Sequence, residues 1–312
     1  MTSQLIKYET RDEWLRSRSK GIGGSDIAAI LGANTHRTPY QVWEDKTERG
    51  EKFEGNKFTR RGQYMEDAVS NYFEDVTGHR LIKASDTDEI LIHKQHPFIL
   101  GSPDRRYFDS EGGKGVLECK TTMMSIDQDV DSLPKTWFIQ LQWYLGLTGY
   151  KRGTIAWAEL GYTSDFKHLE IDFNPMFFAY MVDEACKFWN DYVLTDTPPP
   201  ATTSEDVERI YATHTESKYI NASTEFLEMY NELKELTAQI KELTERSDNL
   251  KEGIKLALMD AEGATYQDQV LVTWKSSKPG MKFDASKLKA EKPDVWMQYA
   301  NETPGSRRFL VK

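Results

Sequence analysis

Three consecutive prolines, Pro198 to Pro200, lie within the segment TDTPPPATTSED at residues 195–206. Proline lacks a backbone N–H and its ring clashes with the preceding helical turn, so this run favours an extended linker over a helix or a central strand. A chain of 312 residues is long enough for a buried core on one side of such a linker and an appendage on the other. We predict a first domain over residues 1–196, a linker over 197–204 and a C-terminal extension over 205–312.

The part before the linker alternates helical and strand-like patterns. Helical spacing, with Gly, Thr-Pro or Pro at the ends, covers residues 25–31, the segment from Thr38-Pro39 onward, 58–76, 133–147 and 175–194. Apolar or alternating runs typical of strands cover residues 89–93, 105–108, 115–120, 153–160 and 166–172. This order predicts a mixed α/β domain.

Beyond the linker, apolar residues recur at alternating spacings of three and four. They are Phe226, Met229, Leu233, Leu236, Ile240, Leu243, Leu250 and Ile254, interrupted at Ser247. This pattern is typical of a coiled coil or a helical hairpin, and equally of an amphipathic helix packed on its own domain, so both interpretations remain open. We expect a β-hairpin over residues 264–275, then two short helices and a final strand over 307–312.

Composition excludes several classes of protein. The two cysteines, Cys119 and Cys186, cannot form a disulfide framework or a cysteine-based zinc site. No apolar run approaches the ~20 residues of a membrane span, and the N-terminal residues lack the apolar core of a signal peptide, so we expect a cytosolic protein with no membrane partner. The net charge of −10 argues against a general nucleic-acid coat, although residues 14–62 carry ten Lys or Arg against six acids and leave room for a basic groove.

The segment GSPDRRYFDSEGGKGVLECKTT at residues 101–122 brings charged side chains together. In a strand over 115–120, side chains alternate faces, so Glu118 and Lys120 point the same way and Cys119 points the other way. The glycine-rich turn at 109–114 can return Glu118 to a position beside Asp104 on the preceding strand. Two carboxylates and an ammonium group are therefore expected to converge.

Carboxylate oxygens without His or Cys companions suit Mg²⁺ or Mn²⁺ better than zinc. A nuclease uses such a cation to polarise the scissile phosphate and to activate water, and a nearby lysine can orient the nucleophile or offset charge in the transition state. An Asp in a turn and an exposed Glu-x-Lys also occur in proteins without an active site. The spacing alone leaves both interpretations open.

Several segments together resemble a known family. Pro103-Asp104 followed by Glu118-Cys119-Lys120 resembles the PD-(D/E)XK nuclease motif. KGIGGSDIAAILG at 20–32, RGQYME at 61–66, GSPD at 101–104 and QLQ at 140–142 occur in the order typical of YqaJ-type viral recombinases, the phage lambda exonuclease family. The resemblance covers roughly residues 10–195 and implies a restriction-endonuclease-like core, in which helices flank a mixed central sheet.

The resemblance also implies roles for individual residues. Asp104 and Glu118 are similar to the metal ligands, with the main-chain carbonyl of Cys119 as a further ligand, and Lys120 is similar to the catalytic lysine. Glu66 resembles the acid that completes the site, acting through a metal-bound water or through Lys120, and Gln140 resembles the glutamine that places water or substrate. Residues expected to contact DNA or its phosphates are Ser25, Arg18, Ser102, Arg61 and Arg105. Each has a plainer alternative, since Glu66 could be a surface acid, Gln140 could fill a buried polar gap and Ser25 could be an N-cap.

By this resemblance we expect a Mg²⁺-dependent exonuclease that digests linear double-stranded DNA 5′ to 3′ and leaves single strand for recombination. Mn²⁺ is expected to substitute for Mg²⁺. The family implies a homotrimer, a single-strand annealing protein as partner and a phage or prophage protein in a bacterial cytoplasm. Two alternatives remain: a DNA endonuclease with the same site, and a non-catalytic module that binds DNA ends or a partner. We expect residues 205–312 to serve oligomerisation or partner binding.

Overall fold

The computed structural model describes residues 2–50, 55–82, 88–161, 164–301 and 305–311. It divides into two compact units, Met1–Ile210 and Tyr211–Lys312. The division falls later than the predicted linker at 197–204, because helix α7 (Ser204–Ile210) packs on the first unit. Asp206 of α7 is buried and accepts a hydrogen bond from the Thr38 hydroxyl at 2.7 Å, while Arg209 pairs with Glu44 at 3.0 Å.

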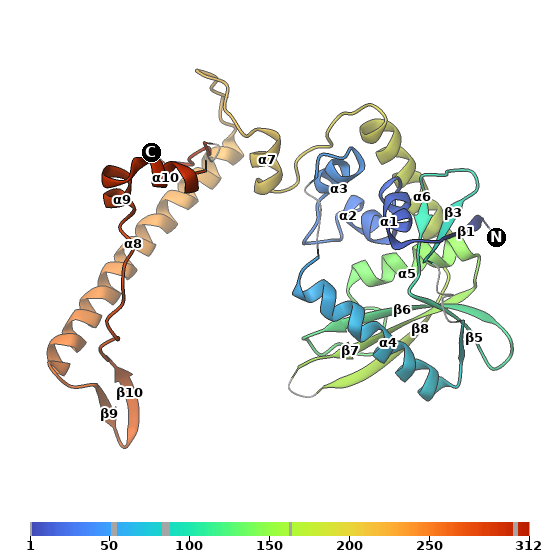
Figure 1. Cartoon of the computed structure of the whole chain (residues 1–312), viewed down its shortest axis with the longest axis horizontal. Coiled ribbons are helices and arrows are strands. Elements are labelled where there is room, and N and C mark those ends of the chain that lie inside the picture. The colour runs from blue at the N-terminus through green and yellow to red at the C-terminus, as the bar shows by residue number, and fades with distance from the viewer. Residues whose placement is uncertain (1, 51–54, 83–87, 162–163, 302–304, 312) are drawn as a thin grey trace. The chain divides into compact units, whose positions relative to one another are not determined.

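The first unit is built on a five-stranded sheet in the order β2-β5-β6-β7-β8 (Figure 1). These strands are β2 (Arg80–Ile82), β5 (Arg105–Phe108), β6 (Lys114–Thr122), β7 (Arg152–Glu159) and β8 (Asp165–Asp172). Strands β6 and β7 run parallel, whereas the other neighbours run antiparallel. The sheet is therefore mixed, as expected.

Two helices cover the two faces of this sheet. Helix α4 (Lys57–Thr77) places Val69 and Phe73 in a core with Leu117 of β6, and α5 (Lys135–Thr148) places its apolar side chains in a second core with Val116. Because Val116 and Leu117 are neighbours in one strand, they point to opposite faces, so both faces of β6 are buried. The predicted fold class, a mixed central sheet flanked by helices, is confirmed.

A smaller sheet, in the order β1-β3-β4, consists of β1 (Ser3–Tyr8), β3 (Asp88–His93) and β4 (Leu100–Gly101). Helix α1 (Arg11–Ser19) packs Trp14 against Ile90 and Leu100. The prediction missed β1, β2, β4 and α1. These elements are short and bury few side chains, so their apolar pattern is weak and tertiary pairing decides their structure.

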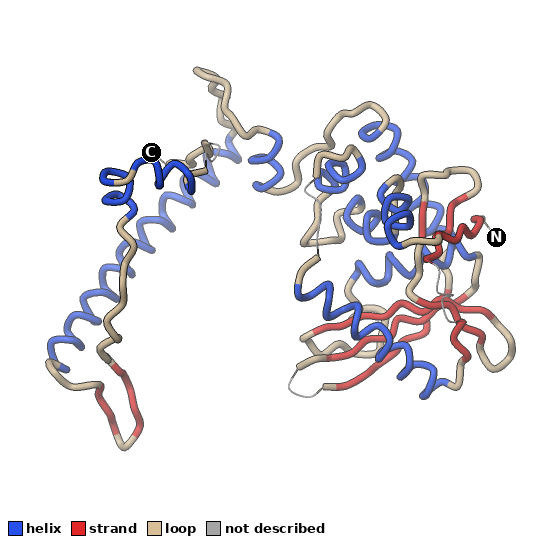
Figure 2. The backbone as a smooth tube through the Cα atoms, viewed as in Figure 1, coloured by secondary structure: helices blue, strands red, loops and turns tan. Residues whose placement is uncertain are grey.

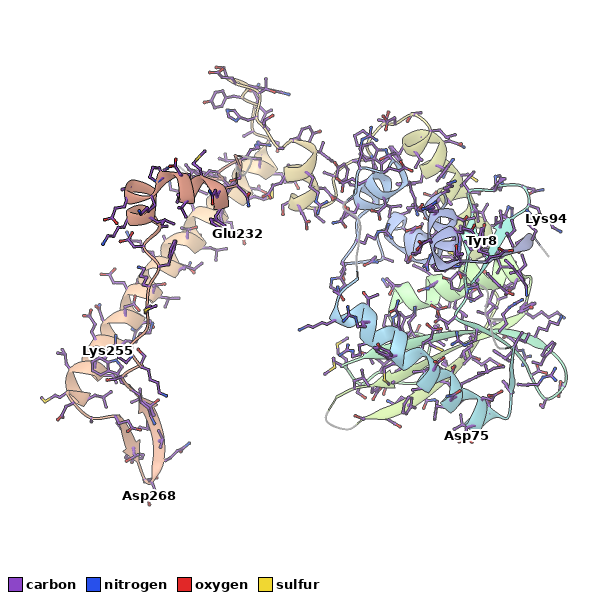
Figure 3. The ribbon with its side chains drawn as sticks, viewed as in Figure 1. Tyr8, Asp75, Lys94, Glu232, Lys255 and Asp268 are labelled. Atoms are coloured by element: carbon purple, nitrogen blue, oxygen red, sulfur yellow. The ribbon has the colours of Figure 1, made fainter. Side chains whose placement is uncertain are left out.

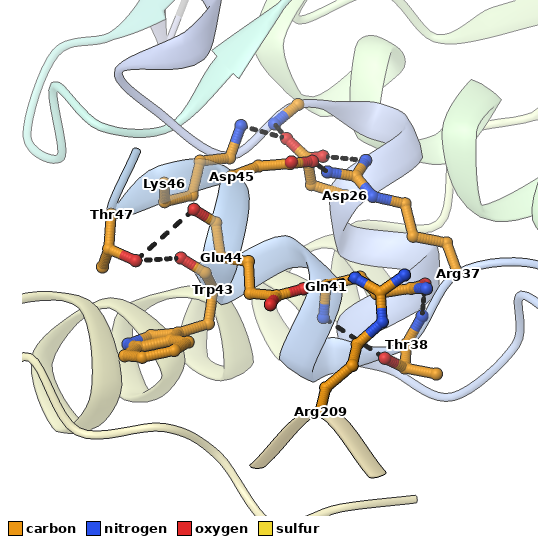
Figure 4. Close-up of polar contacts among 11 residues, drawn as sticks. Asp26, Arg37, Thr38, Gln41, Trp43, Glu44, Asp45, Lys46, Thr47 and Arg209 are labelled. Carbon is orange, nitrogen blue, oxygen red and sulfur yellow. Dashed lines mark hydrogen bonds and ion pairs between the residues drawn. The ribbon is translucent and has the colours of Figure 1, made fainter. Parts of the chain in front are cut away.

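Helices α2 (Gly24–Ile30) and α3 (Pro39–Lys46) are joined by a buried ion cluster (Figure 4). The Asp26 carboxylate accepts a hydrogen bond from the Gly23 N–H at 2.9 Å and pairs with Arg37 at 2.5 Å and Lys46 at 2.8 Å. The start of α2 lies against α5, because a Cβ at Gly24 would come within 2.9 Å of the Gln140 side chain. Helix α6 (Pro175–Phe188) continues into a π-helical turn, η1 (Trp189–Val193).

The second unit contains a 35-residue helix, α8 (Thr224–Leu258), a hairpin of β9 (Gly263–Tyr266) and β10 (Gln269–Thr273), and two short helices, α9 (Ala285–Glu291) and α10 (Pro293–Tyr299) (Figure 2). The predicted final strand over 307–312 is wrong for its described part, since residues 305–311 are not in a strand. A strand needs a neighbour for its backbone hydrogen bonds. Here β9 and β10 pair with each other, and the Arg307 side chain instead donates to the Tyr211 carbonyl at 3.2 Å.

Candidate active site

Strand β6 carries an acid and a base on the face toward α5. The Lys120 Nζ donates to the Glu118 Oε1 at 2.7 Å, and Glu118 is buried with 1% of its surface exposed. Cys119 points to the other face and packs in the core under α4. The alternation predicted for this strand therefore holds, and it places both charged groups in one location.

Asp104, the residue just before β5, lies at the same location. The hairpin turn contains Gly112 in the left-handed region at φ +83°, and its register sets Arg105 opposite Leu117. Asp104 then lies beside Cys119, whose backbone N–H donates to the Asp104 Oδ2 at 2.7 Å. In a strand, the N–H and C=O of one residue point to the same side, so the Cys119 carbonyl lies on this edge as well.

Helix α5 supplies a fourth polar group, Gln140. The Gln140 Oε1 accepts a second hydrogen bond from the Lys120 Nζ at 2.8 Å, and the Gln140 Nε2 donates to the Tyr144 hydroxyl at 3.1 Å. The buried Tyr144 is not among the residues predicted for the site. Its position four residues after Gln140, one turn along the same helix face, is the signal that could have found it.

Helix α4 brings Glu66 to the edge of the site. The Glu66 Oε1 accepts a hydrogen bond from the Arg105 Nη1 at 2.5 Å, and the Arg105 Nη2 pairs with Asp67 at 2.8 Å. Arg105, predicted to contact DNA, is therefore held by two acids. Arg106 lies on the other side of the strand, because neighbouring side chains alternate, and it pairs with Glu89 at 2.6 Å.

These groups surround one pocket of about 280 Å³. Its lining includes Glu66, Asp104, Glu118, Cys119, Lys120 and Gln140. The five side chains expected from the sequence to be catalytic are all in this set. Helix α4 contributes Glu66, the residue before β5 is Asp104, strand β6 contributes Glu118 and Lys120, and helix α5 contributes Gln140. The pocket therefore forms only when the sheet and both of its helices have assembled.

Burial makes negative charge costly in this pocket. Burial first, and the Asp104 carboxylate second, raise the pKa of Glu118 to about 8. Burial likewise raises the pKa of Asp104 and of Glu66. Burial disfavours the charged form of Lys120, but Glu118 and Asp104 outweigh it and raise the pKa of Lys120, which is therefore an ammonium ion at neutral pH. The acids outnumber the lysine, so an added cation would relieve their repulsion.

One buried oxygen atom of the site, the Glu118 Oε2, lacks a hydrogen-bond partner among the described residues. A carboxylate oxygen left in this state costs free energy unless a cation or a water contacts it. Where the structure describes the chain, no three His, Cys, Asp or Glu side chains form a metal-binding group by themselves. An ion here would use the Asp104 and Glu118 carboxylates, the Cys119 carbonyl and waters, an oxygen-only set that fits Mg²⁺ or Mn²⁺.

Comparison with known proteins agrees with the resemblance seen in the sequence. A model of the YqaJ-like viral recombinase domain matches residues 13–151. The uncharacterized protein YqaJ of Bacillus subtilis (strain 168) is 32% identical over 310 residues, which cover 97% of this chain and 94% of that protein. The chain belongs to the YqaJ-like viral recombinase family. The predicted family is confirmed, and membership supports a nuclease role on DNA.

Two solved structures resemble this family member more distantly. An alkaline exonuclease from Laribacter hongkongensis is 15% identical and has a TM-score of 0.46, with 64% of this chain and 98% of that chain covered. A phage-related exonuclease from Haemophilus somnus 129PT is 14% identical and has a TM-score of 0.42, with 57% and 96% covered. None of the helices in the described ranges combines the length and the apolar composition of a membrane span.

Two of the residues predicted to contact DNA lie in the N-terminal helices, Arg18 in α1 and Ser25 in α2. Ser25 is in the first turn of α2, next to Gly24 and its contact with Gln140. The Arg18 guanidinium group stacks on the Trp14 ring, 4.9 Å from its centroid. Burial raises the pKa of Asp104, and the positive charge of Arg18 is one of several that oppose this rise. Arg18 therefore lies close enough to interact electrostatically with Asp104.

Two further predicted residues make contacts within the fold. The Ser102 hydroxyl donates to the Glu89 carbonyl at 2.9 Å, so this side chain joins the end of β4 to β3. The Arg61 Nη1 lies 3.9 Å from the Met123 sulfur, close to where β6 ends. These contacts do not test a role on DNA, which stays a prediction.

Proposed function

We propose that this YqaJ-family chain is a Mg²⁺-dependent deoxyribonuclease that digests linear double-stranded DNA from its ends. The observation that carries this proposal is the convergence of Asp104, Glu118 and Lys120 in one pocket. Lys120 is fixed there by two hydrogen bonds, to Glu118 and Gln140, and a buried Glu118 oxygen lacks a partner among the described residues. Family membership supports DNA as the substrate.

Asp104, Glu118 and the Cys119 carbonyl would hold the cation, and Glu66 would contact it through water. When bound, such a cation polarises the scissile phosphate and lowers the pKa of an attacking water. Glu66 is held in place by Arg105, and Asp104 by the Cys119 N–H, so neither side chain has to be ordered when the cation enters. Preorganised ligands of this kind keep the binding energy available for the reaction.

Lys120 provides a side-chain positive charge in the pocket that would hold the reacting phosphate. Because its pKa is raised, it remains an ammonium ion, and it can offset the charge that develops on the phosphate in the transition state. Gln140 orients this ammonium group through its Oε1, and Tyr144 fixes the amide plane of Gln140 from the other side. The chain Lys120–Gln140–Tyr144 therefore sets the direction in which the lysine points.

The finer parts of the proposal come from family resemblance. Arg18 and Ser25 would bind the 5′-terminal phosphate, which gives 5′-to-3′ polarity, and Ser102, Arg61 and Arg105 would line the DNA path. The product would be single strand for recombination by an annealing protein. We propose a homotrimer that acts in the cytoplasm of a bacterium carrying the phage or prophage.

The test is incubation of linear duplex, carrying either 5′-phosphate or 5′-hydroxyl ends, and of covalently closed circles, with Mg²⁺ or with EDTA. We expect Mg²⁺-dependent loss of strand from 5′ ends, faster with 5′-phosphate, and intact circles. Cleavage of closed circles would overturn the exonuclease proposal in favour of an endonuclease. Binding of ends without cleavage in Mg²⁺ or Mn²⁺ would overturn it in favour of a binding module.

A further inference from the structure

Helix α8 exposes an apolar stripe along most of its length. The stripe consists of Phe226, Met229, Leu233, Leu236, Ile240, Leu243, Leu250 and Ile254, whose exposed fractions range from 39% to 64%. Surface helices in a monomer usually bury such residues. An exposed row of this length along a 35-residue helix is typical of an interaction surface.

The spacing of the stripe defines what kind of surface fits it. The apolar residues alternate by three and four, a repeat of 3.5 residues, which keeps a seam facing a second helix that supercoils with it. Phe226, Leu233, Ile240, Ser247 and Ile254 take the a positions, and Met229, Leu236, Leu243 and Leu250 take the d positions. The partner is therefore a helix with the same repeat, and a second copy of α8 has it.

Charges beside the seam distinguish the two possible directions of pairing. The g positions include Glu225, Glu232, Gln239 and Arg246, and the e positions include Thr237, Thr244 and Lys251. In a parallel pair, each g residue faces the e residue five positions later on the other helix, so Arg246 meets the partner's Lys251, which is repulsive. In an antiparallel pair g faces g, and Glu232 meets the partner's Arg246, which is attractive.

We propose that α8 pairs antiparallel with α8 of a second copy of this chain, in the register that sets Glu232 against the partner's Arg246. In this register Phe226 packs on the partner's Leu250, Leu233 on the partner's Leu243 and Leu236 on the partner's Ile240. Ser247, which would face itself in a parallel pair, packs beside the partner's Met229. A two-fold axis passes near Ala238, so the Glu–Arg pair forms twice.

The second unit itself agrees with this register. The paired segments span residues 224–252 and end before Lys255, whose ammonium group lies 5.7 Å from the Trp274 ring. The hairpin that carries Trp274 can therefore keep its contact with the end of α8. Figure 3 labels Glu232 in the first half of the helix and Lys255 near its end. If the first units form a trimer as well, two-fold pairing of α8 joins two trimers into six copies.

Charge reversal in the full-length chain tests the pairing, with mass measured by sedimentation equilibrium. Glu232→Arg should weaken association through α8 at least tenfold and halve the mass, and Glu232→Arg combined with Arg246→Glu should restore it. Glu235→Arg is the matched control, because it makes the same charge change on the outer face of α8 and should leave the mass unchanged. Helix content by circular dichroism and cleavage of linear duplex report whether each variant is folded.

A cysteine scan tests direction and register. In the proposed pair Gln239 faces the partner's Gln239, so Gln239→Cys should form a disulfide-linked dimer on mild oxidation. The unmodified chain controls for Cys119 and Cys186. Cross-linking of Leu236→Cys instead would show a parallel pair and overturn the proposal. The proposal would also be overturned if Glu232→Arg had the same mass as the wild type, or if the double variant stayed dissociated. Both outcomes are independent of the result of the nuclease assay.

Discussion

Replacing Asp26 by asparagine should destabilise the first unit by about 3–5 kcal/mol, the range found when one partner of a buried ion pair is removed. The Asp26 carboxylate is buried and serves two cations, Arg37 at 2.5 Å and Lys46 at 2.8 Å. The Lys46 side chain is only 6% exposed, so water cannot replace the lost partner. Asparagine keeps the shape of the side chain, but it leaves the buried Lys46 ammonium group without its counterion and leaves Arg37 with Asp45 alone.

Urea unfolding at pH 7 measures this loss, with Asp45→Asn as the matched control. Asp45 pairs with the same Arg37, but its side chain is 46% exposed, so the control should lose less than about 1 kcal/mol. A difference between the two variants within about 1 kcal/mol would refute the reasoning that burial decides the contribution. Cleavage should also fall in Asp26→Asn, because the start of α2 lies against Gln140.

Acid provides a second check on the same group. Burial opposes ionisation of Asp26, but Lys46 and Arg37 outweigh it and hold its pKa well below the ordinary value of 3.8. The stabilisation is therefore complete above this ordinary value, and it is lost as pH falls toward the lower pKa of the folded state. The gap in stability between wild type and Asp26→Asn should stay constant from pH 7 to about 5 and narrow below pH 4.

Three further predictions concern the pocket and the boundary between the units. Lys120→Ala should lower the turnover of linear duplex by about 10²–10³-fold, with DNA binding largely unchanged by fluorescence anisotropy, and wild-type turnover would contradict its role. Tyr144→Phe removes one hydrogen bond of about 1 kcal/mol from Gln140, so kcat should fall about fivefold with KM unchanged, whereas a raised KM with normal kcat would point to substrate binding instead. A chain that ends after Ile210 should still hydrolyse linear duplex. A chain that ends after Thr203 lacks the hydrogen bonds of Asp206, so its first unit should lose about 1–3 kcal/mol of stability. Equal melting temperatures of the two truncated chains would show that α7 does not stabilise the first unit.

Much of the first unit could be predicted because its sequence is locally consistent. Helix α4 has a strong apolar period, β6 alternates the charged Glu118 and Lys120 with Cys119, and the Thr38-Pro39 pair marks the start of α3 through its N-cap. The elements whose structure depends on tertiary pairing could not be predicted from the sequence. Strand β1 has Leu5 exposed and gains its order from pairing with β3. Helix α7 follows the prolines, yet a buried Asp206 ties it back to the first unit.

The pocket itself followed from the period of two in β6 and from the hairpin turn before it. The residues that support the pocket could not be predicted in this way, because their partners are distant in sequence or because spacing alone does not show which partner they contact. Arg105 was expected on DNA, and only the assembled fold shows that α4 presents Glu66 and Asp67 to it. Tyr144 has the apolar surroundings of any core tyrosine, and only the position of Gln140 shows that its hydroxyl supports the lysine.

The most direct test of the site is titration of Mn²⁺ into the chain, followed by the electron paramagnetic resonance signal of the free ion. Wild type should remove Mn²⁺ from solution, whereas Asp104→Asn and Glu118→Gln, which keep the shape of each side chain and delete its charge, should both lose this binding. Asp67→Asn, beside the pocket but not lining it, should bind as wild type does. Undiminished binding in Asp104→Asn and Glu118→Gln would contradict the assignment of these two carboxylates as ligands of the catalytic cation.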